Sequence, residues 1–177
     1  MRFEIRRLHD AFKITTVYVT HDQSEAMVTS DRIVVMNKGR IEQIDAPHTL
    51  YARPKSRFVA GFIGRTNFLE GTRQGSDVRF DGFSAAAGLL EGANGAGGLL
   101  YSLRPQAIGL SGQKPNGSSV AVESEIAGRS YLGEYWDYQV RPLAGAAGQG
   151  FDRPEVVFEV GSRVWLEIDP AAMVRVE

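Results

Sequence analysis

The chain has 177 residues, enough for one or two domains with buried cores, and its 43% hydrophobic and 23% charged residues are typical of a folded globular protein. Its 20 Lys and Arg residues nearly balance 21 Asp and Glu residues, which excludes the overall basic surplus that attracts nucleic acid. Because it has no cysteine, disulfides, thiolate zinc sites and cysteine nucleophiles are excluded, and a reducing cytoplasm is permitted.

The first segment predicts an amphipathic helix, since Ile5, Leu8 and Phe12 recur at helical spacing. Acidic residues interrupt it, so it lacks the continuous apolar core of a secretory signal. The weakly charged stretch at residues 82–103 is rich in glycine and cannot supply the roughly 20 apolar helical residues that a membrane span needs. We therefore expect neither export nor membrane insertion.

A β-branched and aromatic run follows at residues 15–20 and predicts a largely buried strand of the parallel-sheet kind. Next, Asp22 and Glu25 have the spacing of a capping box. In this motif the Asp22 carboxylate accepts from free backbone N–H groups while Glu25 reaches back to the start of the helix. A short helix is expected from there toward Ser30.

Residues 32–36 and 40–44 are strand-like, and the turn residues between them predict a hairpin. Pro47 is expected to begin a short helix and Pro54 to end it, because proline suits the first turn of a helix and disfavours helical backbone before it. A last helix is predicted over residues 56–63, closed by a glycine.

Beyond residue 66 the hydrophobic period changes from 3.6 to 2. Alternating apolar residues predict half-buried antiparallel strands around residues 156–160 and 164–168. Further short strands are expected at residues 68–73, 78–80, 99–103, 120–126 and 135–141, which suggests a small barrel or sandwich. The glycines of residues 82–117 and the Gly/Ala stretch 144–150 predict mobile loops.

The charge balance also changes along the chain. Residues 1–67 hold 11 Lys and Arg and 7 Asp and Glu, whereas residues 68–177 hold 9 and 14. This shift predicts two domains, 1–66 and 67–177. The first contains one predicted buried strand and a hairpin, which is too little to close the layers of an α/β domain.

The first part, residues 2–67, resembles the C-terminal end of the nucleotide-binding domain of ABC-transporter ATPases of the importer subfamily, which includes maltose, polyamine and ferric-iron systems. The matching residues are Thr20-His21-Asp22, Ser24-Glu25-Ala26, Asp31-Arg32-Ile33 and Gly39-Arg40-Ile41. Residues 68–177 resemble the regulatory domain of this subfamily, an oligomer-binding-like β-barrel called TOBE. They carry Asn67-Phe68-Leu69-Glu70-Gly71, Leu103-Arg104-Pro105, Tyr131-Leu132-Gly133 and Gly161-Ser162-Arg163-Val164-Trp165-Leu166.

The resemblance implies an α/β remnant of an ABC nucleotide-binding domain followed by an all-β OB-like (TOBE) barrel. The phosphate loop, glutamine loop, LSGGQ signature and Walker B carboxylates of the family are missing from the sequence. We therefore expect a fragment that does not itself bind or hydrolyse ATP, because hydrolysis depends on those parts. ATP and Mg²⁺ would be cofactors of the intact protein only.

His21 is the one residue that the resemblance places in the chemistry, as the switch histidine. In the intact enzyme its imidazole would contact the γ-phosphate of ATP and help to position the attacking water. From the residues alone, a histidine after a strand is more simply a residue at the start of the next helix. Asp22 is better explained as a helix cap than as a catalytic carboxylate.

The remaining candidates have structural explanations. His9 and His48 lack partners at metal-ligand spacing, so no metal site is expected. The cations of residues 2–13 are interspersed with acids and predict a solvated helix face. Among the aromatic residues 131–138, Trp136 and Tyr138 share an alternating face with Val140 and are expected in the core, which argues against base stacking.

Two further features of the second domain have alternative interpretations. Arg104-Pro105 predicts a fixed turn whose arginine pairs across the barrel, and this structural role is preferred to ligand binding. Trp165 lies opposite the buried face of its strand and is either a dimer contact or a partly covered strand residue.

The resemblance also implies a homodimer docked on the permease subunits at the cytoplasmic face of the membrane, with uptake of polyamine or ferric iron favoured over sugar. The second hypothesis is a stand-alone regulatory or dimerisation module that binds a small ligand or a protein.

Overall fold

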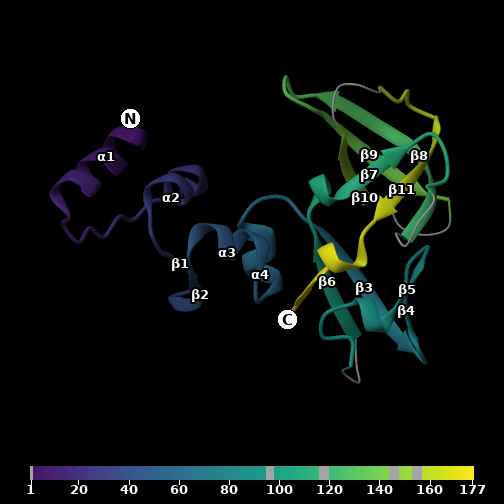
Figure 1. The fold of residues 1–177 in the computed structure, drawn as a ribbon, viewed down its shortest axis with the longest axis horizontal. Helices are drawn as coiled ribbons and strands as arrows, with labels where there is room; N and C mark the ends of the chain where they lie inside the picture. Colours follow the sequence, from purple (N-terminus) through teal and green to yellow (C-terminus); the bar gives the residue numbers. More distant parts are fainter. Residues whose placement is uncertain (1, 95–97, 116–119, 144–147, 153–156) are drawn as a thin grey trace. The chain divides into compact units, whose positions relative to one another are not determined.

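The computed structural model describes residues 2–94, 98–115, 120–143, 148–152 and 157–177. The chain forms two compact units, Met1–Gly64 and Arg65–Glu177, here called unit 1 and unit 2 (Figure 1). No helix within these described ranges is long and apolar enough to cross a membrane.

Unit 1 consists of short helices and one hairpin. Its elements are α1 Arg2–Phe12, α2 Gln23–Thr29, β1 Ile33–Asn37, β2 Arg40–Asp45, α3 Pro47–Ala52 and α4 Arg57–Phe62. The predicted first helix, hairpin and proline-bounded helix are confirmed. The hairpin turns at Lys38 and Gly39, with φ of 47° and 78°, the left-handed region that such turns require.

The helix ends of unit 1 follow local capping chemistry. Pro47 occupies the first turn of α3, and the backbone leaves the helix at Arg53, before Pro54. The Ser56 hydroxyl accepts from the Val59 N–H at 3.3 Å and caps α4, and Gly64 follows with φ of 77°. The last predicted helix is therefore also confirmed.

A small core holds the hairpin against α3 and α4. It contains the buried residues Val35, Leu50, Val59 and Ile63. Gln43, which is buried, completes the attachment: its Nε2 donates to the Arg53 carbonyl at 3.1 Å, and its Oε1 accepts from the Lys55 N–H at 2.9 Å. Its amide thereby satisfies backbone groups of the link between the two helices.

The predicted buried strand at residues 15–20 is wrong. This segment has no regular secondary structure, and the side chains of Val17 and Val19 are 88% and 89% exposed. A strand exists only where a neighbour accepts its backbone hydrogen bonds, and no described strand pairs with this segment. The segment is apolar in composition, but the described residues do not bury its side chains.

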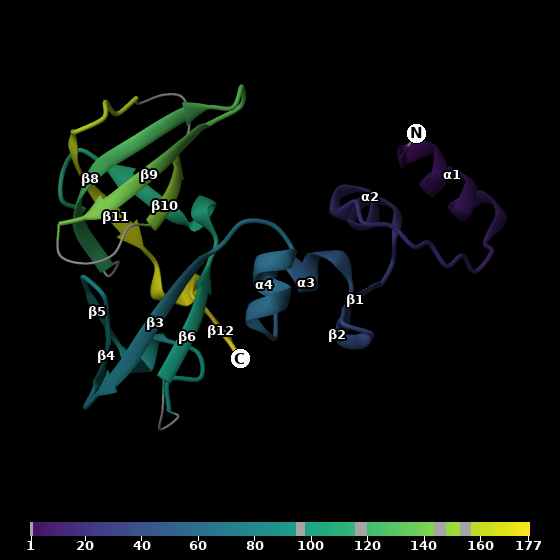
Figure 2. The same cartoon turned by 180° about the vertical axis from the view of Figure 1, so that it is seen from behind.

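Unit 2 is all β, as predicted, and its strands form two five-stranded antiparallel sheets (Figures 1 and 2). The first has the order β12-β6-β3-β4-β5 and the second the order β10-β9-β8-β11-β7. The edge strands β10 and β7 approach each other, so the second sheet curls toward a barrel. The strands are β3 Asn67–Gln74, β4 Asp77–Phe80, β5 Ser84–Ala86, β6 Gly98–Leu103, β7 Ile108–Ser111, β8 Val120–Tyr131, β9 Trp136–Pro142, β10 Gly148–Asp152, β11 Arg163–Ile168 and β12 Val174–Val176, with single 3-10 turns η1 Ala87–Leu89, η2 Pro105–Ala107 and η3 Pro170–Ala172.

One continuous core joins the two sheets, with Tyr101 and Leu103 contributed by the first and Ile126, Tyr138 and Val140 by the second, all fully buried. The alternation predicted for residues 164–168 is confirmed, since every second residue of β11 is buried. Because inward and outward side chains alternate along each strand, both sheets can bury one face in this shared core.

Two other predictions for this half of the chain are corrected. Residues 157–160 form no strand, and Val156 lies outside the described residues. Phe158 nevertheless packs against the core, and its N–H donates to the Tyr138 hydroxyl at 3.2 Å. Strands β5, β6 and β7 lie within the glycine-containing region 82–117, so its described residues are not loop throughout. Of the stretch 144–150, the first four residues lie outside the described ranges and the last three begin β10.

Candidate functional site around His21

The segment before α2 is held by one carboxylate. The Tyr18 hydroxyl donates to Glu25 Oε2 at 2.8 Å, and the Thr20 hydroxyl donates to the same oxygen at 3.1 Å. The Asp22 N–H in turn donates to Thr20 Oγ1 at 3.0 Å. Three groups from residues 18–22 are therefore tied, directly or through Thr20, to one side chain of α2.

Asp22 caps α2 as predicted, because its Oδ1 accepts from the Glu25 N–H at 3.0 Å. The second half of the predicted capping box is wrong. Glu25 accepts from Tyr18 and Thr20, while the Asp22 amide donates to the Thr20 hydroxyl. The threonine thus satisfies the amide to which Glu25 was expected to bond.

Glu25 also changes the ionisation of its neighbour. The hydrogen bond from the Tyr18 hydroxyl to the Glu25 carboxylate raises the pKa of Tyr18 above its ordinary value, because it stabilises the protonated phenol. Burial and the negative charge of Glu25 act in the same direction.

His21 lies in the bend between Thr20 and the capping residue Asp22, and its side chain is exposed. The residue follows a segment without regular secondary structure, whereas the sequence predicted a strand there. Its imidazole is open to solvent in unit 1 and forms no hydrogen bond or salt bridge with the described residues. A ligand could therefore reach it.

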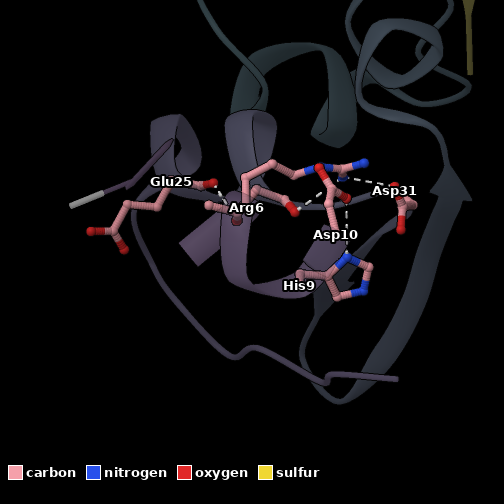
Figure 3. Close-up of polar contacts among 6 residues, drawn as sticks. Arg6, His9, Asp10, Glu25 and Asp31 are labelled. Carbon is pink, nitrogen blue, oxygen red and sulfur yellow. Dashed lines mark hydrogen bonds and ion pairs between the residues drawn. The ribbon is translucent and has the colours of Figure 1, made fainter. Parts of the chain in front are cut away.

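The Arg6 guanidinium joins α1 to the end of α2 (Figure 3). It contacts Asp31 Oδ1 at 2.7 Å, Asp10 Oδ2 at 3.2 Å and the Thr29 carbonyl at 3.5 Å. Hydrogen bonding to Arg6 and its positive charge hold the pKa of Asp31 below the ordinary value. This network makes the Arg6 cation a partner of two acids, and its role is structural.

The other histidines do not gather ligands. His9 Nδ1 lies 3.5 Å from Asp10 Oδ1, as Figure 3 shows, and the His48 ring lies 3.2 Å from the Thr49 hydroxyl. His9 is half-buried and His48 exposed. The described part of the chain contains no group of three or more His, Cys, Asp and Glu that could hold a metal ion.

The aromatic residues of unit 2 form a packed cluster. Trp136 lies 5.1 Å from Tyr131 and 6.4 Å from Tyr138 between ring centroids, and the Arg129 guanidinium lies 5.1 Å from the Trp136 ring. Tyr138 also meets Phe158 edge-on at 6.1 Å. As predicted, the face with Trp136, Tyr138 and Val140 packs on the core, where such ring contacts add to the stabilisation from burial.

Arg104 and Trp165 have local partners as well. Pro105 begins η2 and is buried, which confirms the predicted turn. The Arg104 guanidinium donates to the Arg65 carbonyl at 2.9 Å. Trp165 is half-buried, with Lys114 Nζ 5.3 Å from its ring centroid, so it is at least a partly covered strand residue.

Comparison with known proteins defines the class of the β-rich unit. Residues 101–176 match the family model of the TOBE domain. A crystal structure of the cytoplasmic molybdate-binding protein ModG shares the fold, with a TM-score of 0.50 and 13% identity over 62% of this chain and 94% of that chain. Unit 2 therefore contains a TOBE domain and has an OB-like structural neighbour.

The matches to relatives of similar sequence extend over both units. The chain is 43% identical over 148 residues to the spermidine/putrescine import ATP-binding protein PotA of Thermobifida fusca, covering 81% of this chain and 38% of the relative. It is 37% identical to the Fe(3+) ions import ATP-binding protein FbpC of Escherichia coli, covering 98% and 48%. It is also 38% identical to the sn-glycerol-3-phosphate import ATP-binding protein UgpC of Salmonella typhimurium, covering 82% and 46%. Over most of its length the chain is similar to ABC importer ATP-binding subunits, and it spans less than half the length of these relatives.

Proposed function

We propose that this chain acts as part of the ATP-hydrolysing subunit of a bacterial ABC importer. Residues 1–66 would be the end of its nucleotide-binding domain and residues 67–177 its regulatory domain. The observation that carries the proposal is the similarity to importer ATP-binding proteins over 79–98% of the chain. This similarity extends well beyond the TOBE domain and therefore includes unit 1.

Within unit 1 the proposal assigns one contact with nucleotide. The exposed His21 imidazole can donate an N–H hydrogen bond to a terminal phosphate oxygen. Such a charge-assisted bond contributes about 1.5–3 kcal/mol, and more where charge develops in the transition state. The described residues do not make a complete Mg²⁺ site, so no metal ligand and no metal-dependent step is assigned to them.

A hybrid enzyme tests the role of His21. The matching segment of the Thermobifida fusca relative is replaced by this chain, and steady-state ATP hydrolysis is compared between the hybrid, its His21→Ala variant and a His48→Ala control. Loss of a donor to developing charge should lower kcat by about 10²–10³-fold. His48 is also exposed in unit 1 and should be neutral. Full turnover with His21→Ala would refute the assignment.

The chain by itself is proposed to be inactive, because positioning and charge stabilisation in phosphoryl transfer need a phosphate loop and a metal site that its sequence lacks. Isothermal titration of the purified 177-residue chain with ATP and Mg²⁺ should give no measurable heat of binding. Tight, Mg²⁺-dependent binding would contradict this part of the proposal.

The partners and the transported substrate extend the same proposal. We propose a homodimer that docks on permease subunits at the inner face of the membrane and serves uptake of polyamine or ferric iron. The names of relatives such as PotA and FbpC support these two substrates. The name of UgpC, which matches at 38% identity, keeps sn-glycerol 3-phosphate as the competing choice.

The second candidate is a regulatory or dimerisation module formed by unit 2. Its own continuous core and its TOBE match favour a part that works as a separate body. Sedimentation at several concentrations and a thermal-shift screen with small ligands test it. A strictly monomeric chain that no ligand stabilises would count against this candidate.

A further inference from the structure

The carboxylate of Glu25 connects the residues on both sides of His21. On the N-terminal side it accepts from the hydroxyls of Tyr18 and Thr20, at 2.8 and 3.1 Å. On the C-terminal side, the Asp22 N–H donates to the Thr20 hydroxyl at 3.0 Å. The only residue between Thr20 and Asp22 is His21, so Glu25 holds the residue before His21 directly and the residue after it through the Thr20 hydroxyl.

This arrangement is separate from the cap of α2. The Asp22 carboxylate accepts from the Glu25 backbone N–H at 3.0 Å, and this bond does not use the Glu25 side chain. The Glu25 carboxylate is therefore free of the capping role that its sequence position suggested. Alanine is also the best helix former, so removing the side chain leaves α2 with its cap and with a favourable residue at that position.

We propose that Glu25 is a positioning residue for His21: its carboxylate fixes the loop before the histidine directly, and the residue after it through the Thr20 hydroxyl, so that the exposed imidazole is held in one place. This inference rests on the proposed contact of His21 with nucleotide. The side chains of Val17 and Val19 show that the loop needs such a hold, because their exposure of 88% and 89% means that no described packing anchors it. Fixing a reacting group before the substrate arrives lowers the entropic cost of the reaction.

The primary test measures amide hydrogen exchange in the 177-residue chain. The Glu25→Ala variant should exchange the Asp22 N–H about tenfold faster than wild type, because Thr20 loses the acceptor that orients its hydroxyl. The backbone N–H of residue 25 should keep its protection, because its own acceptor, the Asp22 carboxylate, is untouched. The pKa of Tyr18 should fall toward its ordinary value in the same variant.

Two further variants separate positioning from general loss of structure. Glu25→Gln keeps an oxygen that can accept both hydroxyl protons, so it should restore most of the protection of Asp22. Glu42→Ala is the matched control, since Glu42 also accepts from two side chains of unit 1, Asn37 and Ser56, and does not contact the loop. It should leave the exchange of the Asp22 N–H unchanged.

The same substitutions in the hybrid ATPase test the consequence for catalysis. Glu25→Ala should lower kcat about tenfold with little change in the KM for ATP, and Glu25→Gln should recover most of it. Unchanged exchange at Asp22, or a full kcat in Glu25→Ala where His21→Ala is inactive, would overturn the inference. Faster exchange together with full activity of His21→Ala would instead overturn the proposed role of His21 and leave the hold of Glu25 on the loop established.

Discussion

Replacing Gly71 by alanine should destabilise unit 2. Gly71 lies in β3, and a Cβ added there would lie 2.7 Å from Phe80 Cε1 and 2.7 Å from Val78 Cγ1, where carbon atoms normally keep 3.5–4.0 Å. Both neighbours are buried. The Phe80 ring is stacked on Phe83 at 4.8 Å and meets Tyr101 edge-on at 5.8 Å, so it has little room to retreat.

Overpacking of this kind lowers the free energy of unfolding by about 1–3 kcal/mol. Alanine has a lower backbone entropy than glycine in the unfolded chain, which offsets about 0.5–1 kcal/mol of this loss. We therefore expect a net loss of about 1–2 kcal/mol in the free energy of unfolding. Urea unfolding followed by tryptophan fluorescence measures it, because Trp136 and Trp165 are the two tryptophans of the sequence and both lie in unit 2.

The matched control is Gly98→Ala in the neighbouring strand β6, where Gly98 pairs with Thr72. A Cβ at Gly98 meets no heavy atom of the described residues within 4 Å, so this variant should unfold at or slightly above the wild-type urea concentration. If Gly71→Ala and Gly98→Ala have the same midpoint, the close contacts with Val78 and Phe80 do not limit the packing and the reasoning is refuted.

Two substitutions in unit 1 test its polar contacts. In Arg6→Gln the pKa of Asp31, measured by NMR, should rise toward its ordinary value. The pKa of Asp31 is lower in the folded than in the unfolded chain, so the Arg6–Asp31 pair stabilises α1 of the wild type above about pH 3.8. This contribution is lost as the pH falls through the folded pKa of Asp31. Only the wild type should therefore lose amide protection of α1 in that acid range. Asp22→Ala should weaken α2 by about 0.5–2 kcal/mol and expose the Glu25 N–H to hydrogen exchange. Asp22→Asn keeps a side-chain acceptor and should leave this exchange unchanged. Equal exchange of the Glu25 N–H in the two variants would contradict the cap.

The elements that the sequence predicted correctly are those decided by nearby residues. Lys38 and Gly39 adopt positive φ and turn the hairpin, Pro47 starts α3, and the Ser56 hydroxyl caps α4. Each of these choices depends on the backbone preference or hydrogen bonding of residues within one helical turn. Such signals are complete in the local sequence.

Residues 15–20 show what local composition leaves undetermined. β-branched and aromatic residues favour a strand because they pack well on a sheet, but the sheet must be present. In unit 1 no described strand lies beside them, and the apolar side chains of Val17 and Val19 face solvent. The pattern therefore identified residues that suit a buried strand without identifying the strands that would bury them.

Short strands were missed for a related reason. Strands β5, β7 and β12 have three or four residues, too few for alternation to be recognised, and each is defined by a longer partner: β4, β11 and β6, respectively. Strand β8 likewise continues to Tyr131, five residues beyond the predicted end, because β9 pairs with it across a register shift between Ile126 and Gly128. Pairing partners distant in sequence decide these lengths.

The candidate site shows the same division between local and spatial information. Spacing alone correctly gave Asp22 as the cap, but it assigned Glu25 to the Asp22 amide, which bonds to Thr20 instead. A hydroxyl two residues before a backbone amide can accept its hydrogen bond, and the only entropic cost is fixing the rotamer of the hydroxyl side chain. The glutamate is then available to accept from hydroxyls on the preceding segment. Thr20 thus takes the place of Glu25 as the partner of the Asp22 amide, and Glu25 instead supports the loop that carries His21. This change of partner is the physical basis for assigning Glu25 to the positioning of His21.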